Sequence, residues 1–532
     1  MIAQGQMKNF VVAALIACFA VTACGENLVY HEIKTDLPGH IVPWYSPDPG
    51  TAYDPCVMLV WNFWKNMQPC PNGVKYYLQH QVWKPRHDGR GLGGDQLSMA
   101  LSSWALLYAY CGQKAVVDDM ALMADYCLAH GLSAAEGAWP NMPYPYNTDV
   151  HSGVYDGDMV AGKGVLQPDK AAAFGAELVS LYKITGSKKY LQAAVAIADT
   201  LVAKVAAGDA DNSPWPFRVN AKTGQAVPVR DCSGKYTANW TGAIRLLDSL
   251  SAMNQGQAAK YATARSTAIA WLKSYPLKTN KWGPFFEDVK RDSNTEINAD
   301  TLAWFILERP DLWGPTWQTD ARAILDYTAA TFGNNRWVKY GVKAINEQTA
   351  YMMPGNSHSS RHASVELLYA EKTGDASRKP QAVRLLNWAT YMVDADGKNR
   401  YPGDDIWLTD GYGDYVRHYL RAMAAAPELS PQDKNRLLRT SSVVKTISYA
   451  KTGITYSTFD KSSRELLRVA FAPRGVKAGA AELPRLDSAS ELDKREGYTF
   501  GLKGDAPGVL RIRHDNSGDV TIAGDGAGKQ GR

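Results

Sequence analysis

The segment from Asp169 to Lys204, DKAAAFGAELVSLYKITGSKKYLQAAVAIADTLVAK, decides the fold of this chain. Apolar residues recur at helical spacing on both sides of Gly186, and a glycine at that position can take the left-handed conformation that ends a helix. The pattern therefore predicts two helices joined by a short turn. One helical hairpin cannot bury its apolar face alone, so further hairpins are expected.

The same scheme occurs at residues 95–131 and 361–393, where the first helix of each pair ends in Leu-Tyr shortly before Gly112 or Gly374. The segments between hairpins are long and rich in Pro, Gly and aromatic residues: 132–167, 206–239, 275–297 and 392–415. Long loops of this kind are usually functional or disordered, and their aromatic content favours function. The sequence predicts a mainly α fold, an (α/α)6–7 barrel over residues 25–430, with a cleft at the loop end.

The composition changes after Pro427, where short β-branched and aromatic segments alternate with turns. We expect a small antiparallel β domain over residues 438–525. The last residues, 526–532, are Gly-rich and are expected to be a disordered tail.

The first residues are typical of an export signal. Lys8 precedes an apolar run of about a dozen residues, Phe10 to Val21, which is too short to span a bilayer. The run ends in Val-Thr-Ala-Cys, which resembles the bacterial lipoprotein box with Cys24 as the lipidated residue; the alternative is a plain signal peptide cut near Ala23. Residues 1–23 are therefore expected to be removed, and the mature protein to be periplasmic or on the cell surface, with a membrane contact only through a lipid anchor.

The composition favours a carbohydrate partner. The formal charge of +5 permits an acidic substrate but is too weak and dispersed for nucleic acid. The chain has 28 Tyr and 16 Trp, and aromatic faces stack on sugar rings, although most of these residues should be core. Of the cysteines outside the signal, Cys56 and Cys70 enclose a short Pro-rich loop and are the expected disulfide pair.

The densest polar cluster is NSHSSRH, which runs from Asn356 to His362 and stands before a helical stretch. A zinc site would need a third ligand and usually a Glu between the two histidines, whereas Arg361 stands there, so no metal or cofactor is expected. Asn356, Ser357 and Ser359 are good helix caps. The free N–H groups of a helix start, with Arg361 added, would also attract a carboxylate.

A carboxylate pocket is the first requirement for β-elimination on a uronic acid. The carboxylate must be neutralised, a base must remove the C5 proton, and an acid must protonate the leaving oxygen. Arg361 and Asn356 could neutralise the carboxylate and His358 could be the base. Tyr412, between two glycines in a loop that opens a helix, is the candidate phenol.

These motifs, with the segment DGYGDYVRHYLRAM and the C-terminal β region, resemble the (α/α)-toroid polysaccharide lyases, and the nearest family is polysaccharide lyase family 38, the glucuronan and alginate lyases. The resemblance implies an acidic polysaccharide substrate. It also implies that His358 and Tyr412 transfer protons, with Arg361 and Asn356 near the carboxylate. Further residues are expected to contact substrate: His362, Tyr415, Glu347, Tyr351, Asn239, Trp240, Tyr236 and Arg90.

Two other functions fit the same fold. A glycoside hydrolase, such as an unsaturated-uronyl hydrolase, would need a pair of carboxylates, and the available residues are Asp95, Glu287, Asp288 and Asp405, with Asn298 and Asp300 nearby in the sequence. A non-catalytic glycan-binding lipoprotein would explain the aromatic residues without proton chemistry.

Overall fold

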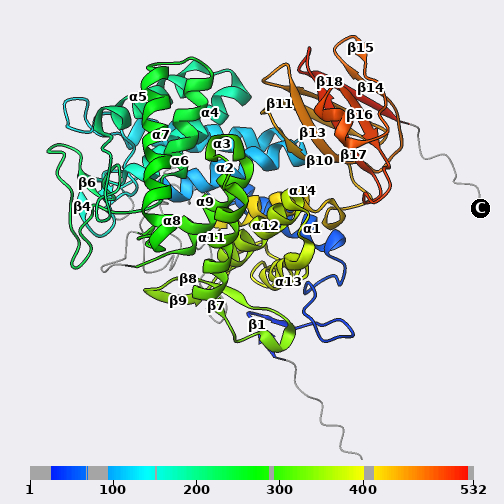
Figure 1. Cartoon of the computed structure of the whole chain (residues 1–532), viewed down its shortest axis with the longest axis horizontal. Coiled ribbons are helices and arrows are strands. Elements are labelled where there is room, and N and C mark those ends of the chain that lie inside the picture. Colours follow the sequence, from blue (N-terminus) through cyan, green and yellow to red (C-terminus); the bar gives the residue numbers. More distant parts are fainter. Residues whose placement is uncertain are drawn as a thin grey trace, which may run out of the picture.

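The structure is a computed structural model that describes residues 26–67, 69, 94–149, 152–286, 293–400 and 412–524; for residues 94–96 and 412 it describes only the backbone. Helices make up slightly under half of this part of the chain, more than any other type of structure, and a β domain follows the last long helix (Figure 1).

Six helices form a ring in which each packs against the next and the last packs against the first. These inner helices are α2 (Gly94–Cys111), α4 (Pro168–Thr185), α6 (Thr241–Ala252), α9 (Glu296–Glu308), α12 (Asn356–Thr373) and α14 (Tyr412–Ala425). Most residues of α4, α9 and α12 are buried, as expected for helices that are covered on all sides.

A second layer of helices covers the ring, and each outer helix packs mainly against one inner helix, which for all but the first of them is the inner helix that precedes it in the sequence. The outer helices are α1 (Pro49–Lys65), α3 (Lys114–His130), α5 (Lys188–Lys204), α7 (Ala258–Ser274), α11 (Trp317–Thr331) and α13 (Lys379–Thr390); two short helices, α8 (Pro276–Thr279) and α10 (Pro310–Trp313), lie in connections. Gly186 and Gly374, with φ of 73° and 79°, end α4 and α12 in the left-handed conformation, as the sequence predicts.

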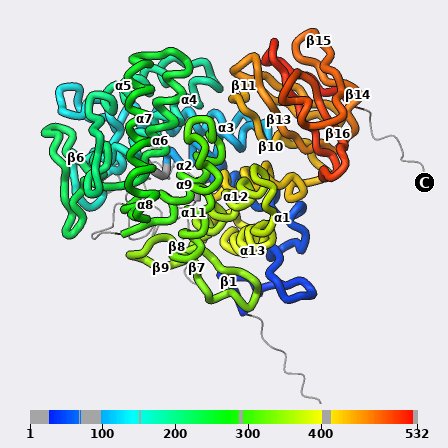
Figure 2. Tube along the Cα trace, in the orientation of Figure 1, coloured from blue at the N-terminus to red at the C-terminus, as the bar shows by residue number. Residues whose placement is uncertain are grey.

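The inner helices run in the same direction, because a short connection returns the chain through an outer helix after each of the first five. Their N-termini therefore meet at one end of the ring, which the long connections also reach (Figure 2). Among the described residues the strands in these connections are short: β3 (Gly157–Asp158), β4 (Gly162–Lys163), β5 (Val165–Leu166), β6 (Val219–Asn220), β7 (Gly333–Asn334), β8 (Ala344–Gln348) and β9 (Tyr351–Pro354). Near the N-terminus β1 (Asn27–Leu28) pairs with β2 (His31–Glu32).

The β domain lies at the opposite end, against α2, α4 and α14 (Figure 1). It contains two antiparallel sheets with the strand orders β10-β13-β17-β16 and β11-β12-β18-β14-β15. Their strands are β10 (Arg436–Thr440), β11 (Val444–Ala450), β12 (Gly453–Thr458), β13 (Ser463–Arg468), β14 (Pro473–Ala478), β15 (Ala481–Glu482), β16 (Gly497–Phe500), β17 (Val509–His514) and β18 (Asp519–Gly524).

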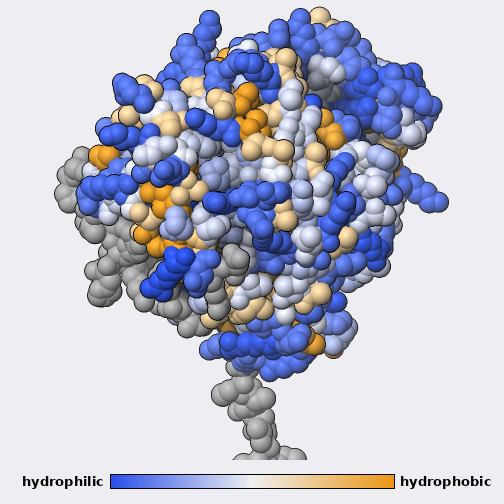
Figure 3. Space-filling model, turned by 60° about the vertical axis from the view of Figure 1, so that its left-hand side comes forward, coloured by the Kyte–Doolittle hydropathy of each residue, from blue (hydrophilic) through white to orange (hydrophobic). Residues whose placement is uncertain are grey.

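The predicted fold class is confirmed: the chain is mainly α, with a ring of helical hairpins and a small C-terminal antiparallel β region. The ring has six inner helices among the described residues. Within that part of the chain, none of the helices has both the length and the apolar character needed to span a bilayer. The face drawn in Figure 3 is mostly hydrophilic with small hydrophobic patches, which agrees with an apolar core inside the ring.

Candidate active site

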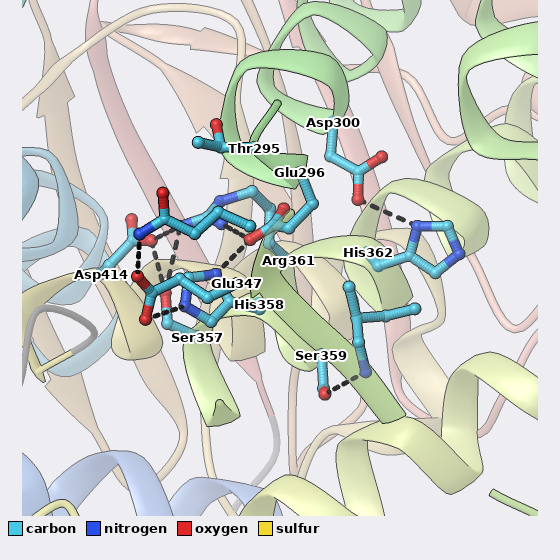
Figure 4. Close-up of polar contacts among 12 residues, drawn as sticks. Thr295, Glu296, Asp300, Glu347, Ser357, His358, Ser359, Arg361, His362 and Asp414 are labelled. Carbon is cyan, nitrogen blue, oxygen red and sulfur yellow. Dashed lines mark hydrogen bonds and ion pairs between the residues drawn. The ribbon is translucent and has the colours of Figure 1, made fainter. Parts of the chain in front are cut away.

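The polar cluster lies at the start of α12, inside the ring. Gly355, in an extended conformation (φ −126°, ψ 160°), precedes the helix, and no side chain caps it. The prediction that Asn356, Ser357 or Ser359 caps this helix is therefore wrong. Because the first turns of an inner helix face other inner helices, these polar side chains are buried and meet residues of α9, α14 and β8 instead (Figure 4).

His358 is held between two carboxylates. Its Nδ1 bonds to Oε1 of Glu296, the first residue of α9, and its Nε2 lies 3.8 Å from Oε2 of Glu347 on β8. The bond to Glu296 favours a proton on Nδ1 and leaves Nε2 to exchange protons. The side chain is only 3% exposed, and burial alone would lower the pKa of His358, but the two carboxylates raise it overall.

Arg361 bridges two buried carboxylates. One guanidinium nitrogen donates to Glu296, and the other donates to Asp414 of α14 and, at 3.0 Å, to Oγ of Ser357. Burial lowers the pKa of Arg361 despite these partners, and its side chain is 2% exposed. The predicted role of Arg361 as a direct neutraliser of a substrate carboxylate is therefore corrected, because its guanidinium already pairs with two protein carboxylates. One of them is Glu296, so Arg361 fixes the position of the carboxylate that bonds to His358.

Asn356 and Glu347 lie beside this network. The Nδ2 of Asn356 donates to Oδ1 of Asn399, and Oε1 of Glu347 accepts from Nε2 of Gln348 at 2.8 Å. Both side chains are buried. The sequence-predicted residues His358, Arg361, Asn356 and Glu347 are thus brought together.

His362 belongs to a separate polar group. Its Nδ1 bonds to Oδ2 of Asp300 at 2.9 Å and its Nε2 lies 3.4 Å from Glu366, on the side of α12 that lines a groove with Arg378 of the outer layer. Figure 4 shows the imidazole turned away from His358. Burial opposes protonation, but the two carboxylates raise the pKa of His362 to about 10. The predicted substrate contact is corrected: His362 forms a buried ion pair, and Asp300 is its partner.

Three predicted substrate contacts are core residues instead. Trp240 is fully buried and packs on Trp215 with ring centroids 4.9 Å apart. Tyr236 is buried with its hydroxyl bonded to the carbonyl of Lys281. Tyr415 is fully buried, so none of these aromatic side chains offers a face to a sugar.

Cys56 is a free thiol, so the predicted disulfide with Cys70 is wrong as far as Cys56 is concerned. The residue lies on α1, where its Sγ is 3.0 Å from the hydroxyl of Tyr415. Helix α1 turns the thiol into the core, where burial raises the pKa of Cys56 to about 12. Cys70 lies outside the described residues.

Two other predicted contacts are accessible. Tyr351 on β9 is 51% exposed. Asn239 is half-buried and its Nδ2 donates to Oδ2 of Asp169 at 2.8 Å. The remaining candidates lie outside the described residues: Arg90, Glu287, Asp288, Asp405, and the side chains of Asp95 and Tyr412. Tyr412 is the first residue of α14 and stands two positions before Asp414; the structure describes its backbone.

The ring encloses a cavity at the end that the long connections reach, where the sequence predicts a cleft, but most of its charged lining residues were not predicted. This front chamber, of about 60 Å³, is lined at the N-terminal half of the inner helices and contains more cations than anions. Its charged lining residues are Lys170, Glu177, Arg245, Arg417 and Arg421. Cations on helices that are otherwise buried, such as the pair four apart in VRHYLR, are the signal that could have identified it.

Two of these cations, Lys170 and Arg417, each pair with a buried carboxylate. The Nζ of Lys170 donates to the carbonyl of Phe285 at 2.7 Å, lies 3.2 Å from Asp169 and is 3.3 Å from the Phe285 ring centroid. Arg417 donates to Oγ of Ser102 at 3.1 Å and pairs with Asp414.

Two consecutive residues connect the front chamber to His358. Phe285 lines the chamber, and the ring of the next residue, Phe286, meets the imidazole of His358 edge-on at 6.4 Å. Asp414 pairs with both Arg417 and Arg361, so ion pairs also connect the chamber to the carboxylate that holds His358. Phe285–Phe286 and these ion pairs therefore connect His358 to the cationic chamber.

No protein-family model and no curated protein sequence matches this chain. Solved structures do match in fold. A sugar epimerase from a ruminal bacterium is 13% identical, with 70% of this chain and 98% of that chain covered and a TM-score of 0.52. Cellobiose 2-epimerase from Bacillus thermoamylovorans B4167 is 14% identical, with the same coverage and TM-score. A D-mannose isomerase is 10% identical, with 70% and 97% covered and a TM-score of 0.53.

These structures place the chain among (α/α) toroids, the fold of sugar-processing enzymes, and at such identities they establish the fold alone. They give no support to polysaccharide lyase family 38 in particular.

Proposed function

We propose that this chain is a carbohydrate-active enzyme that cleaves a uronic-acid polysaccharide, glucuronan or alginate, by β-elimination. The observation that carries the proposal is the position of His358, which is bonded through Nδ1 to Glu296 and connected to a cationic chamber through Phe285 and Phe286. The named activities of the solved structures with this fold, sugar epimerase and mannose isomerase, also concern sugars.

The first requirement is charge neutralisation at the sugar carboxylate. Lys170 and Arg417 line the front chamber, so they replace Arg361 in this role. Lys170 already pairs with Asp169, but that carboxylate also accepts a hydrogen bond from Asn239. Arg417 already pairs with Asp414, but that carboxylate is also paired with Arg361. A substrate carboxylate would therefore enter a region of net positive charge, where the acidity of the adjacent C–H bond increases.

The second requirement is proton transfer. His358 Nε2 takes the C5 proton, the electron pair of that bond forms the C4=C5 double bond, and the C4–O bond breaks. The leaving oxygen takes a proton from an acid, for which Tyr412 at the start of α14 is the proposed residue. Glu296 keeps the imidazole oriented and stabilises its protonated form, as a carboxylate partner does for other catalytic histidines.

A glycoside hydrolase on the same ring is the second candidate. Burial raises the pKa of Glu296 in spite of Arg361 and His358, and a carboxyl group with a raised pKa is the feature of a glycosidase general acid. Glu347 on the other side of His358 would be the second carboxyl group.

One assay separates these functions. Purified protein is incubated with glucuronan, alginate, polygalacturonate or hyaluronan, and both ultraviolet absorbance and reducing ends are followed. A lyase raises the absorbance of the new double bond, conjugated to the carboxylate, in step with the reducing ends. A hydrolase forms reducing ends without that absorbance, and a glycan-binding protein produces neither signal but is retarded in a polysaccharide gel.

We also propose that the chain is exported and anchored through a lipid on Cys24. Cys24→Ala would then release the protein from the membrane fraction of the producing bacterium, whereas a wild-type protein found free in the periplasm would contradict the anchor.

A further inference from the structure

A second cavity lies inside the ring, next to the front chamber. This rear chamber, of about 210 Å³, lies where the C-terminal halves of the inner helices meet β10 and β11. Glu177, Arg245, Trp304 and Arg421 line both chambers and form the partition between them. In this partition Nη1 of Arg245 donates to Glu177 at 2.8 Å.

Arg421 is the arginine of the partition that stacks on an aromatic ring and forms no ion pair among the described residues. Its guanidinium carbon lies 3.8 Å from the centroid of the Trp304 ring, and it forms no hydrogen bond or ion pair with any side chain that the structure describes. Glu308 lines the rear chamber as well but does not pair with Arg421. Burial, together with the neighbouring Arg417 and Arg245, lowers the pKa of Arg421 well below its usual value, although the charges of Glu308 and Glu177 act in the opposite direction. Arg421 is half-buried, and an anion in the rear chamber would stabilise its charge.

The other two arginines of the rear chamber are already neutralised, and Arg245 pairs with Glu177. Arg439 of β10 forms two bonds to the carboxylate of Glu371, one of them 2.8 Å long. Arg421 is therefore the group that a ligand carboxylate would meet, by a charge-assisted hydrogen bond.

The walls of the rear chamber are mostly apolar. They include Ala105, Leu106, Leu368, Leu420, Ala424 and Val443. Ala105, Leu106 and Val443 are half-buried, so solvent reaches these walls. A sugar would leave its hydroxyl groups unpaired against such a surface, whereas an alkyl chain would bury apolar area there.

We infer that the rear chamber binds a small carboxylate with an apolar body, such as a short-chain fatty acid, with the carboxylate on Arg421 and the alkyl chain against α2, α12 and α14. The site is distinct from His358, and the inference does not depend on the proposed lyase activity.

Isothermal titration of the full mature chain with sodium hexanoate tests this inference, with hexan-1-ol and sodium gluconate as controls for the charge and for the apolar body. Hexanoate should bind at least about tenfold more tightly than either control, because hexan-1-ol lacks the carboxylate and gluconate lacks the apolar chain. Arg421→Gln should weaken hexanoate binding by about tenfold or more. Arg495→Gln, which removes a surface cation of the β domain, should leave it unchanged. Equal binding of hexanoate and gluconate, or full affinity in Arg421→Gln, would overturn the inference.

A second variant keeps the test decisive if Arg421→Gln does not fold. Ala424→Leu adds apolar volume to the chamber wall and leaves Arg421 in place. Loss of hexanoate binding with an unchanged circular dichroism spectrum is expected, and retained binding would place the ligand elsewhere and contradict the inference.

Discussion

The Nδ1 of His358 and a carboxylate oxygen of Glu296 are hydrogen-bonded, although 62 positions separate the two residues in the sequence. The bond exists because α9 and α12 are neighbouring inner helices that run in the same direction, so their first turns lie side by side. It gives the imidazole one orientation and favours one tautomer.

The pH dependence of activity should reveal the hydrogen bond between His358 and Glu296. The carboxylates raise the pKa of His358, and the base form is the neutral imidazole, so activity should fall as pH decreases through that pKa. Glu296→Gln keeps a hydrogen-bond acceptor but removes the charge. The acid limb of kcat/KM should therefore move to lower pH, with kcat reduced about tenfold. Glu482→Gln, an exposed carboxylate of the β domain, is the control, and an unmoved acid limb in Glu296→Gln would contradict the role of Glu296.

Arg417 should determine affinity for the acidic substrate. Arg417→Gln removes a cation from the front chamber, so KM for the polymer should rise about tenfold or more, with a smaller change in kcat and a weaker dependence of KM on salt. Arg417→Lys should recover part of the affinity, and Arg464→Gln, on the surface of the β domain, should have no effect. Steady-state kinetics at several salt concentrations provides the measurement; an unchanged KM in Arg417→Gln would remove Arg417 from the binding site.

His362 should make stability depend on pH above neutrality. Its pKa is raised from 6.5 in the reference state to about 10 in the fold, so the stabilising ion pair is complete below about pH 6.5 and is lost as pH rises toward 10. His362→Gln should lower the free energy of unfolding by about 3 kcal/mol at pH 6, because Asp300 and Glu366 lose their buried partner.

The difference in unfolding free energy between wild type and His362→Gln should then shrink between pH 6 and pH 10. Urea denaturation followed by circular dichroism at several pH values measures it. A difference that stays constant over that range would mean that His362 is not charged in the native protein.

The state of Cys56 can be measured directly. The thiol is buried with a pKa raised to about 12, so iodoacetamide should not label it in the native protein. In denaturant without any reductant it should be labelled completely, as peptide mass spectrometry would detect. Labelling only after reduction would instead demonstrate a disulfide.

The helical hairpins could be predicted from the sequence because their signals are local. Apolar periodicity and the glycines at 186 and 374 specify where the helices of α4–α5 and α12–α13 end, whatever the rest of the chain does. The strands after Arg436 were likewise indicated by short β-branched segments, although β10, β14 and β15 were not recognised separately.

The polar partners could not be predicted, because they are set by which helices are neighbours. Glu296 and Asp414 are remote in sequence from Arg361, and they become its ion-pair partners only because the ring of helices closes. Residue type was also a poor guide to exposure: Trp240 and Tyr415 have side chains suited to sugar contacts, yet both occupy the core. The sequence shows that these polar residues are close together in the chain but does not indicate which of them a substrate could reach.

The most direct test of the central claim is the ultraviolet absorbance of glucuronan and alginate solutions incubated with wild-type protein, His358→Ala, Tyr412→Phe and the control His40→Ala. His40 is a surface histidine near the N-terminus. Wild type and His40→Ala should generate the unsaturated product at the same rate, whereas His358→Ala and Tyr412→Phe should each be slower by about a hundredfold or more with unchanged circular dichroism spectra. Reducing ends without a rise in absorbance, or near-wild-type rates in His358→Ala, would contradict proton abstraction by His358.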